Sequence, residues 1–359
     1  MKLFIPGPVA VSEEIMEEMG RPMIGHRSKE FQELFRNIVN DLKYILNTEN
    51  DVFILTSSAT GGMEAAVKNT VNRKVLCLSN GEFGRRWAEI ARLSGKEVTE
   101  LDFGDGKPFD TSLVKEELGK GYEALTVVIN ETSTGIENNI EEIKELLHEH
   151  PQTLLLADGV TAVFGTRVAP EGIHVLLFGT QKALALPPGL CVIIADKAAM
   201  ERVLQVKNRG YYFDFMENKR SAEKGFTLTT PNIPLMYGLR AQLRNIKHTG
   251  IEAWIRRHER NAMITREFLE ERGFEMFIDQ NNMSKTVTVV VNNMGLDTSE
   301  MITVLKNQGF EIANGYGKLA GKTFRIGHMG VSERDTKVLL ERIDAYLADR
   351  TCFLKATAN

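Results

Sequence analysis

The chain has 359 residues, of which 43% are hydrophobic and 26% charged, so its composition is that of a globular protein and its length favours more than one domain. A formal net charge of −4, with acidic and basic residues mixed throughout, argues against a nucleic-acid partner or an anionic membrane surface. No apolar run approaches the roughly 20 residues of a membrane span, and Cys77, Cys191 and Cys352 lack the spacing of a metal site or disulfide framework. We therefore expect a cytoplasmic protein with no membrane contact and no bound metal.

Short apolar segments alternate with amphipathic helical patterns over the first two thirds of the chain. This alternation predicts an α/β domain with one mostly parallel, seven-stranded sheet that is covered by helices on both faces. The last two segments are joined through Pro187-Pro188-Gly189, a connection too short for a helical crossover, so we expect one antiparallel pair. The predicted strands are 51–57, 74–80, 97–103, 124–131, 153–158, 174–181 and 190–196.

The last third of the chain predicts a second, smaller domain of the α+β class. Its elements are a helical region over 234–272 interrupted near Gly250, strands at 285–293 and 323–329, and helices that begin near Ser299 and Ser332. We expect a large domain over 15–250 and a small domain over 251–359, joined by an N-terminal segment, 1–14.

Two ionisable residues end neighbouring predicted strands at the edge where open α/β sheets bind ligands. Asp158 ends TLLLAD and Lys182 follows HVLLFGTQ. Each has an ordinary alternative, because Asp158 could accept hydrogen bonds from its own turn and Lys182 could reach solvent. Together they favour a carboxylate that holds a protonated heterocycle and a desolvated lysine whose neutral amine bonds to a carbonyl carbon.

Other strand ends carry groups suited to a phosphate, a planar ring and a carboxylate. The turn LTSSATGGMEAA, 55–66, leads into a helix N-terminus and could bind a phosphate, or Ser58 could simply cap the helix. Phe83 could stack on a ligand or belong to the core. Arg325, inside the apolar strand TFRIGHM, needs an anion, either an internal carboxylate or that of a substrate. The combined set describes a pyridoxal 5′-phosphate enzyme that acts on an amino acid.

With these residues the sequence resembles the class V, fold-type I aminotransferases, closest to the alanine:glyoxylate and serine:pyruvate group. The resemblance runs along nearly the whole chain. It is carried by PGPVAVSEEIMEEM, GHRSKEF, NGEFGRRW, ETSTG, ADGVTAVFG, TQKALALPPGL, RGYYFD, IPLMYGL and FRIGHMG. The turn SSATGG departs from the glycine-richer run of relatives, since Ala59 presents its N–H beside a Cβ.

The resemblance implies a role for each candidate. Lys182 bonds covalently to the cofactor and Asp158 pairs with its pyridinium nitrogen. The implied cofactor contacts are Phe83 and Thr132 at the ring and Ser58, Ala59, Thr60 and Gln181 at the phosphate. One or more of Thr229, Thr230 and Asn232 is implied to reach the phosphate in a partner subunit, and which of them does so stays open. Arg325 and Gly7 are implied to bind the substrate carboxylate, in a homodimer whose active sites lie at the interface.

The implied reaction is a ping-pong transamination between a small amino acid (alanine, serine or aspartate) and a 2-oxo acid such as glyoxylate or pyruvate. The sequence offers no obvious second arginine for an acidic side chain, which favours small donors. Two alternatives stay open. One is another class V reaction, such as cysteine desulfuration or lyase chemistry, although Cys77 and Cys191 lie in predicted strands and Cys352 lies in a tail after the last helix. The other is a catalytically silent structural subunit.

Overall fold

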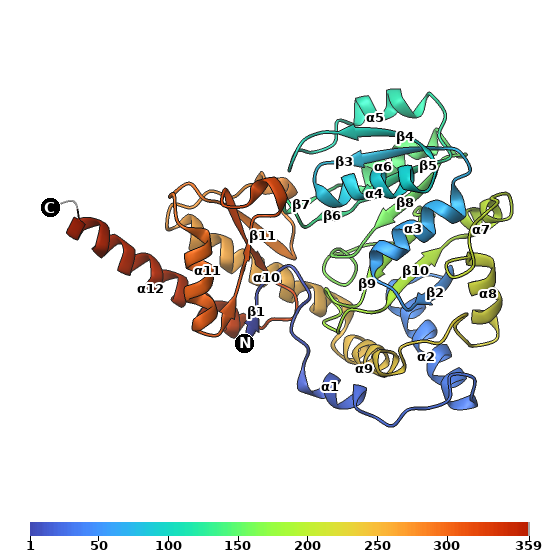
Figure 1. The fold of residues 1–359 in the computed structure, drawn as a ribbon, viewed down its shortest axis with the longest axis horizontal. Helices are drawn as coiled ribbons and strands as arrows, with labels where there is room; N and C mark the ends of the chain where they lie inside the picture. The colour runs from blue at the N-terminus through green and yellow to red at the C-terminus, as the bar shows by residue number, and fades with distance from the viewer. Residues whose placement is uncertain (358–359) are drawn as a thin grey trace.

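A seven-stranded sheet forms the centre of the larger part of the molecule (Figure 1). The computed structural model describes residues 1–357, with side-chain surroundings for residues 1–349. The strand order is β2-β10-β9-β8-β5-β3-β4, which confirms the predicted α/β class and mostly parallel seven-stranded sheet. The strands are β2 (Asp51–Leu55), β3 (Lys74–Ser79), β4 (Glu97–Asp102), β5 (Ala124–Val128), β8 (Leu154–Asp158), β9 (Val175–Gly179) and β10 (Cys191–Ala195).

Strand β10 corrects the expectation of a single antiparallel pair. It lies between β2 and β9 and runs antiparallel to both, so that Val192 is opposite Ile54 on one side and Phe178 on the other. A strand that runs against both of its neighbours makes two antiparallel pairs. The short connection from β9 indicated only the pair with β9, not the pair with β2. The other four pairs are parallel.

Helices cover both faces of this sheet and build two hydrophobic cores. Alternate residues of β2 face opposite sides: Val52 and Ile54 belong to one core, and Phe53 and Leu55 to the other. The first core is covered by α2 (Lys29–Leu46), α5 (Thr111–Leu118), α6 (Ile140–His148) and α9 (Ile233–Thr249). The second is covered by α3 (Ala59–Thr70), α4 (Glu82–Leu93), α7 (Lys197–Val203) and α8 (Phe215–Glu223).

The C-terminal third packs around a three-stranded antiparallel sheet with its own core (Figure 1). The N-terminal strand β1 (Lys2–Leu3) pairs with β12 of this region, and Phe4 is buried in the same core. The elements are α10 (Ile251–Glu270), β11 (Val287–Val291), α11 (Thr298–Asn307), β12 (Phe310–Glu311), β13 (Ala313–Asn314), β14 (Thr323–Gly327) and α12 (Glu333–Thr357). We keep the division into domains 15–250 and 251–359 as a proposal, with which this separate core is consistent.

The remaining elements are short. They are α1 (Glu13–Met19), β6 (Asn130–Glu131), β7 (Ile136–Glu137) and two 3-10 turns at Gln280–Asn282 and Gly317–Leu319. Helix α12 continues to Thr357, so Cys352 lies within a helix and not in a tail after it; its side chain is outside the described residues. Across residues 1–357, no helix has the length and apolar character to cross a membrane.

Candidate active site

The loops that leave one edge of the large sheet enclose a cavity of about 120 Å³. Strands β2, β3, β5, β8 and β9 point the same way, and their carboxyl ends meet at this edge, as expected for ligand sites in open α/β sheets. Eight predicted residues line the cavity: Ser58, Ala59, Thr60, Phe83, Thr132, Asp158, Gln181 and Lys182.

Lys182 sits in a tight turn directly after β9. Its carbonyl accepts the Ala185 N–H at 2.8 Å, and the Thr180 hydroxyl donates to the Pro187 carbonyl at 2.8 Å, so the turn is held at both ends. The amine Nζ donates to the carbonyl of Pro6 at 2.5 Å. Burial lowers the pKa of Lys182 to about 8, because desolvation disfavours the ammonium form more than Asp158 stabilises it. The turn therefore presents a partly buried amine whose pKa is lowered.

Gly7 lies against Lys182, and its replacement by alanine is expected to displace the amine. Its φ is +118°, and a Cβ there would lie 2.6 Å from Cδ and 2.8 Å from Nζ of Lys182. We expect Gly7→Ala to lower the free energy of unfolding by about 1–2 kcal/mol through backbone strain, and also to slow covalent capture of an aldehyde cofactor. Denaturant titration and the rate of colour formation measure the two effects.

Gly121→Ala is the matched control for that variant. Gly121 also has a positive φ, +74°, but an added Cβ would meet nothing within 4 Å. It should share the strain and leave cofactor capture unchanged. Equal capture rates in the two variants would show that Gly7 does not shape the lysine.

Asp158 is a buried carboxylate with one oxygen unsatisfied. It ends β8 and is 3% exposed, and Oδ1 accepts the Val160 N–H at 2.7 Å. The local turn therefore accounts for one oxygen, while no partner of Oδ2 is found within the described part of the chain. Burial raises the pKa of Asp158 to about 7, against the opposing effects of the Val160 amide and Lys182. A cationic ligand group would stabilise the ionised form.

The turn before α3 provides an anion site at a helix N-terminus. Ser58 occupies the N-cap position, yet its side chain makes no capping hydrogen bond. The Ser58 hydroxyl therefore does not accept a hydrogen bond from the first N–H groups of α3. Ser58 borders the cavity with Thr60 and Gln181, so an anion could bind there. Ala59 is buried there, so its Cβ packs in the wall beside the exposed amides.

Phe83 is positioned by Glu131, a residue that sequence reasoning did not single out. The buried Glu131 carboxylate accepts the N–H groups of Phe83 at 2.9 Å and Gly84 at 3.0 Å. It also accepts the Ser133 N–H at 3.1 Å, and so ties the start of α4 to the turn that carries Thr132. Burial raises the pKa of Glu131, while these donors favour its ionised form. The ring and Thr132 are therefore fixed by one clamp.

Arg325 reaches the same region from β14 without an ion-pair partner in the described residues. Nε donates to the Asn314 carbonyl at 2.9 Å, and Nη1 donates to the Thr132 carbonyl at 3.2 Å. Its guanidinium lies 5.4 Å from the ring centroid of Tyr316. Burial lowers the pKa of Arg325 to about 10, still far above neutrality. Carbonyls hold the guanidinium in place and leave its charge for a ligand carboxylate.

Arg86 also borders the site and was not predicted. Arg86 lines the cavity, lies 4.6 Å from the Phe83 ring centroid and donates to the Tyr316 hydroxyl at 3.4 Å. Arg86 therefore borders the cavity, while the expectation that no second arginine binds an acidic substrate side chain stays a prediction. Sequence reasoning missed Arg86 because NGEFGRRW offers two adjacent arginines, of which Arg85 faces Asp102 and Asp105.

The segment 229–232 does not contribute to the cavity of a single chain. Thr230 is exposed, Thr229 is partly buried, and the Asn232 side chain caps α9 by accepting the Leu235 N–H at 3.1 Å. None of the three lines the cavity. Their predicted role concerns a second subunit and stays a prediction.

The described cysteines are poor candidates for chemistry. Cys77 and Cys191 are buried in β3 and β10. Burial raises the pKa of Cys77 to about 12 and raises that of Cys191 as well, so both stay protonated thiols. No cluster of metal ligands occurs among the described residues.

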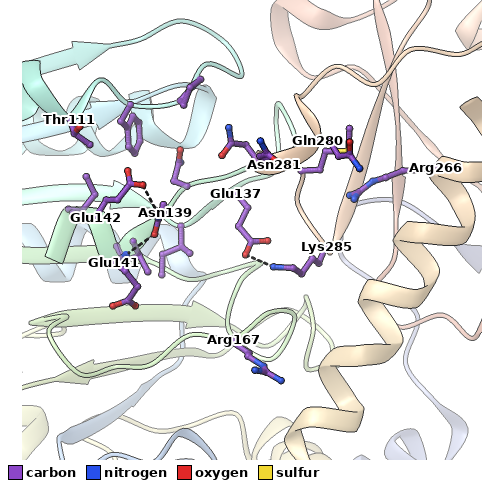
Figure 2. A pocket seen from close by; sticks show the side chains of 18 residues that line it. Thr111, Glu137, Asn139, Glu141, Glu142, Arg167, Arg266, Gln280, Asn281 and Lys285 are labelled. Atoms are coloured by element: carbon purple, nitrogen blue, oxygen red, sulfur yellow. Dashed lines mark hydrogen bonds and ion pairs between the residues drawn. The ribbon is translucent and has the colours of Figure 1, made fainter. Parts of the chain in front are cut away.

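A larger cavity, about 680 Å³, lies between the two parts of the molecule and contains none of the predicted site residues (Figure 2). Several of its charged groups have partners, while Arg266 forms no ion pair within the described residues. Lys285 pairs with Glu137 at 3.0 Å, Arg167 pairs with Glu252, and Arg266 donates to the Ser284 carbonyl. Size alone therefore does not identify the reactive site.

The chain resembles known proteins along nearly its whole length. The family model for class V aminotransferases matches residues 9–324. An uncharacterized aminotransferase of Methanocaldococcus jannaschii is 37% identical, with 97% of this chain and 92% of that protein covered. A serine–glyoxylate aminotransferase of Arabidopsis thaliana is 33% identical, with 97% and 90% covered. The soluble hydrogenase 42 kDa subunit of Anabaena cylindrica is 31% identical, with 97% and 94% covered.

Solved structures extend this likeness to the fold. The aspartate aminotransferase of subgroup IV from Thermus thermophilus superposes with a TM-score of 0.91 at 29% identity, covering 97% of this chain and 99% of that one. The predicted fold-type I architecture is thereby confirmed.

Proposed function

The chain belongs to the class V aminotransferase family, and we propose that it moves the amino group of a small amino acid to a 2-oxo acid with pyridoxal 5′-phosphate as cofactor. Alanine, serine or aspartate would be the donor, and glyoxylate or pyruvate the acceptor. The observation that carries the proposal is that the amine of the partly buried Lys182 shares one cavity with the buried carboxylate of Asp158.

The residues present fit this cofactor. Asp158 Oδ2 lacks a partner and suits a pyridinium N–H, and the uncapped N-terminus of α3 suits a phosphate. Asn130, which also lines the cavity, has a buried Oδ1 without a hydrogen-bond partner in the described chain. Phe83 supplies a ring for stacking. When bound, pyridoxal phosphate supplies an aldehyde for amino groups and an electron-accepting ring.

Lys182 would hold and move the proton in this reaction. Its neutral amine would hold the cofactor at the aldehyde carbon, with loss of water, and a substrate amine would displace it. The freed amine, whose pKa is lowered, would then accept the proton from the substrate Cα. It would deliver that proton to the cofactor carbon that carried the aldehyde. Asp158 keeps the ring nitrogen protonated, and Arg325 orients the substrate through its α-carboxylate.

The assembly and the location of the protein are further parts of the proposal. We infer a homodimer in which Thr229, Thr230 or Asn232 reaches the partner's phosphate group, since none of them serves the cavity of its own chain. The two buried, unpaired thiols are in keeping with a cytoplasmic location.

The rate of cofactor capture should depend on pH through Lys182. Below a pKa of about 8 the amine is protonated and unreactive, so the rate should rise roughly tenfold per pH unit up to pH 8 and level off above it. Arg325 contributes to the lowered pKa, so Arg325→Gln should move the profile to higher pH. Stopped-flow absorbance with added pyridoxal phosphate measures the profile. A midpoint near 10, the value of an ordinary lysine, would contradict the assignment.

The function itself is tested by half-reactions with a panel of amino acids. Holoenzyme is mixed with alanine, serine, aspartate, glutamate or cysteine, and loss of the yellow colour reports amino transfer to the cofactor. Two further measurements complete the test: identification of the 2-oxo acid formed from the donor, and return of the yellow colour when glyoxylate or pyruvate is added. No colour change with any amino acid would refute transamination, and sulfide release from cysteine would favour desulfuration.

One relative gives a reason to keep a second role in view. The Anabaena protein carries the name of a hydrogenase subunit, which would suit a structural role. The intact set of Lys182, Asp158 and Arg325 favours catalysis here. A purified protein that bound no pyridoxal phosphate would support the structural role instead.

A further inference from the structure

A second cavity, about 630 Å³, lies between the N-terminal segment, the junction of α9 and α10, and the start of α12. None of the active-site residues described above lines it. Ala10, Val11, Trp254 and Val331 give it an apolar side, and Arg257 projects a cation beside them.

Arg257 is a largely buried guanidinium without a counter-ion. It stacks on Trp254, 3.3 Å from the ring centroid, and its Nη2 is buried with no hydrogen-bond partner in the described chain. No carboxylate pairs with it among those residues, and burial lowers the pKa of Arg257 to about 10 with no opposing charge. A buried cation is costly unless an anion compensates it.

The charges around Arg257 indicate which anion fits. Lys2 pairs with Asp335 at 3.2 Å, and Arg260 pairs at 3.7 Å with Glu333, which also pairs with Lys337 at 2.7 Å, so the other lining cations each have a carboxylate beside them. One uncompensated positive charge matches a monoanion better than a phosphate dianion. The planar guanidinium matches a carboxylate, and the apolar side matches a short hydrocarbon body. We propose that this cavity binds a small organic monocarboxylate, anchored by Arg257.

This site is connected to the turn that carries Lys182. Trp254 Nε1 donates to the Ala183 carbonyl at 3.2 Å, and Gln242 Nε2 donates to the Leu184 carbonyl at 2.6 Å. Both donors also line the cavity, so a bound carboxylate contacts the residues that brace this turn. The site is thus suited to an effector that acts from outside the reaction centre.

Calorimetric titration of the holoenzyme with butyrate tests the proposal, because butyrate has neither an amino nor an oxo group to react. Saturable binding of one butyrate per chain is expected in Arg325→Gln, whose active site has lost its carboxylate partner. Arg257→Gln should weaken it by at least about tenfold, the effect of losing one charged hydrogen bond, and Arg257→Lys should give an intermediate loss. Arg256→Gln, an exposed neighbour on the same helix, should bind like the wild type. Inorganic phosphate should bind more weakly than butyrate.

Three results would overturn the site. They are absence of saturable butyrate binding, equal affinity in Arg257→Gln, and loss of binding in Arg325→Gln, which would move butyrate to the active site. Thermal melts establish that each variant is folded, and Arg257→Lys serves if the glutamine variant is not. Sedimentation is run alongside, since dissociation of subunits in both Arg257 variants would show that a partner's side chain, not a free carboxylate, fills the cavity.

Discussion

Replacing Lys182 by alanine is expected to reduce transamination by on the order of 10³-fold or more, the usual scale for loss of a positioned proton-transfer group. Lys182 lines the cavity and has a pKa lowered by burial to about 8, so it combines nucleophile and base in one amine. The variant should bind pyridoxal phosphate without the colour change of covalent attachment. Single-turnover mixing with alanine measures the loss, and added ethylamine should restore part of the rate by replacing the missing amine.

Lys96→Ala provides the matched control. Burial also lowers the pKa of Lys96, but its amine donates to the Val71 carbonyl at 2.5 Å, at the far end of the sheet from the cavity. This variant should keep nearly normal turnover. Normal activity or covalent colour in Lys182→Ala would remove the lysine from the mechanism.

The large sheet and the shared position of Asp158 and Lys182 could be predicted because their signals are local. Seven apolar runs of strand length mark strands that are buried on both faces. Parallel strands place their carboxyl ends at one edge of the sheet, so the sequence alone predicts that Asp158 and Lys182 lie at the same edge. The turn at Ser58 could be placed at a helix N-terminus in the same way, because a strand runs directly into a helix there, but the sequence left open whether Ser58 caps that helix.

What the sequence did not reveal depends on distant packing. Tyr316 reaches Phe83 and Arg86 only because the C-terminal third of the chain packs against α4, and no periodicity in the sequence predicts such a contact across 230 residues. In the sequence, Glu131 is one of several polar residues in NETSTG and nothing marks it as special. In the structure, its carboxylate accepts hydrogen bonds from N–H groups at the start of α4. The position of β10 between β2 and β9 likewise depends on how all the strands of the sheet pack together, and the residues of β10 alone do not indicate it.

Arg325→Gln is expected to lower kcat/KM for the amino donor by roughly 10²- to 10⁴-fold. Two charged hydrogen bonds to the α-carboxylate are worth about 1.5–3 kcal/mol each, and each 1.4 kcal/mol corresponds to a factor of ten. Arg325→Lys keeps the charge but loses the planar fork, so it should recover only part of the loss. Steady-state kinetics over a range of donor concentrations measure both variants.

A structural role of Arg325 must be separated from substrate binding, because its side chain also joins the Asn314 and Thr132 carbonyls across the domain contact. Comparing alanine with alaninamide achieves this. The amide lacks the carboxylate, so a wild-type enzyme that binds the carboxylate through Arg325 should strongly prefer alanine. In Arg325→Gln that preference should collapse, since alanine loses its partner and alaninamide loses little. If the substitution only distorted the site, the rates with alanine and alaninamide would fall equally and their ratio would not change. That result would assign Arg325 only to the contact with the Asn314 and Thr132 carbonyls.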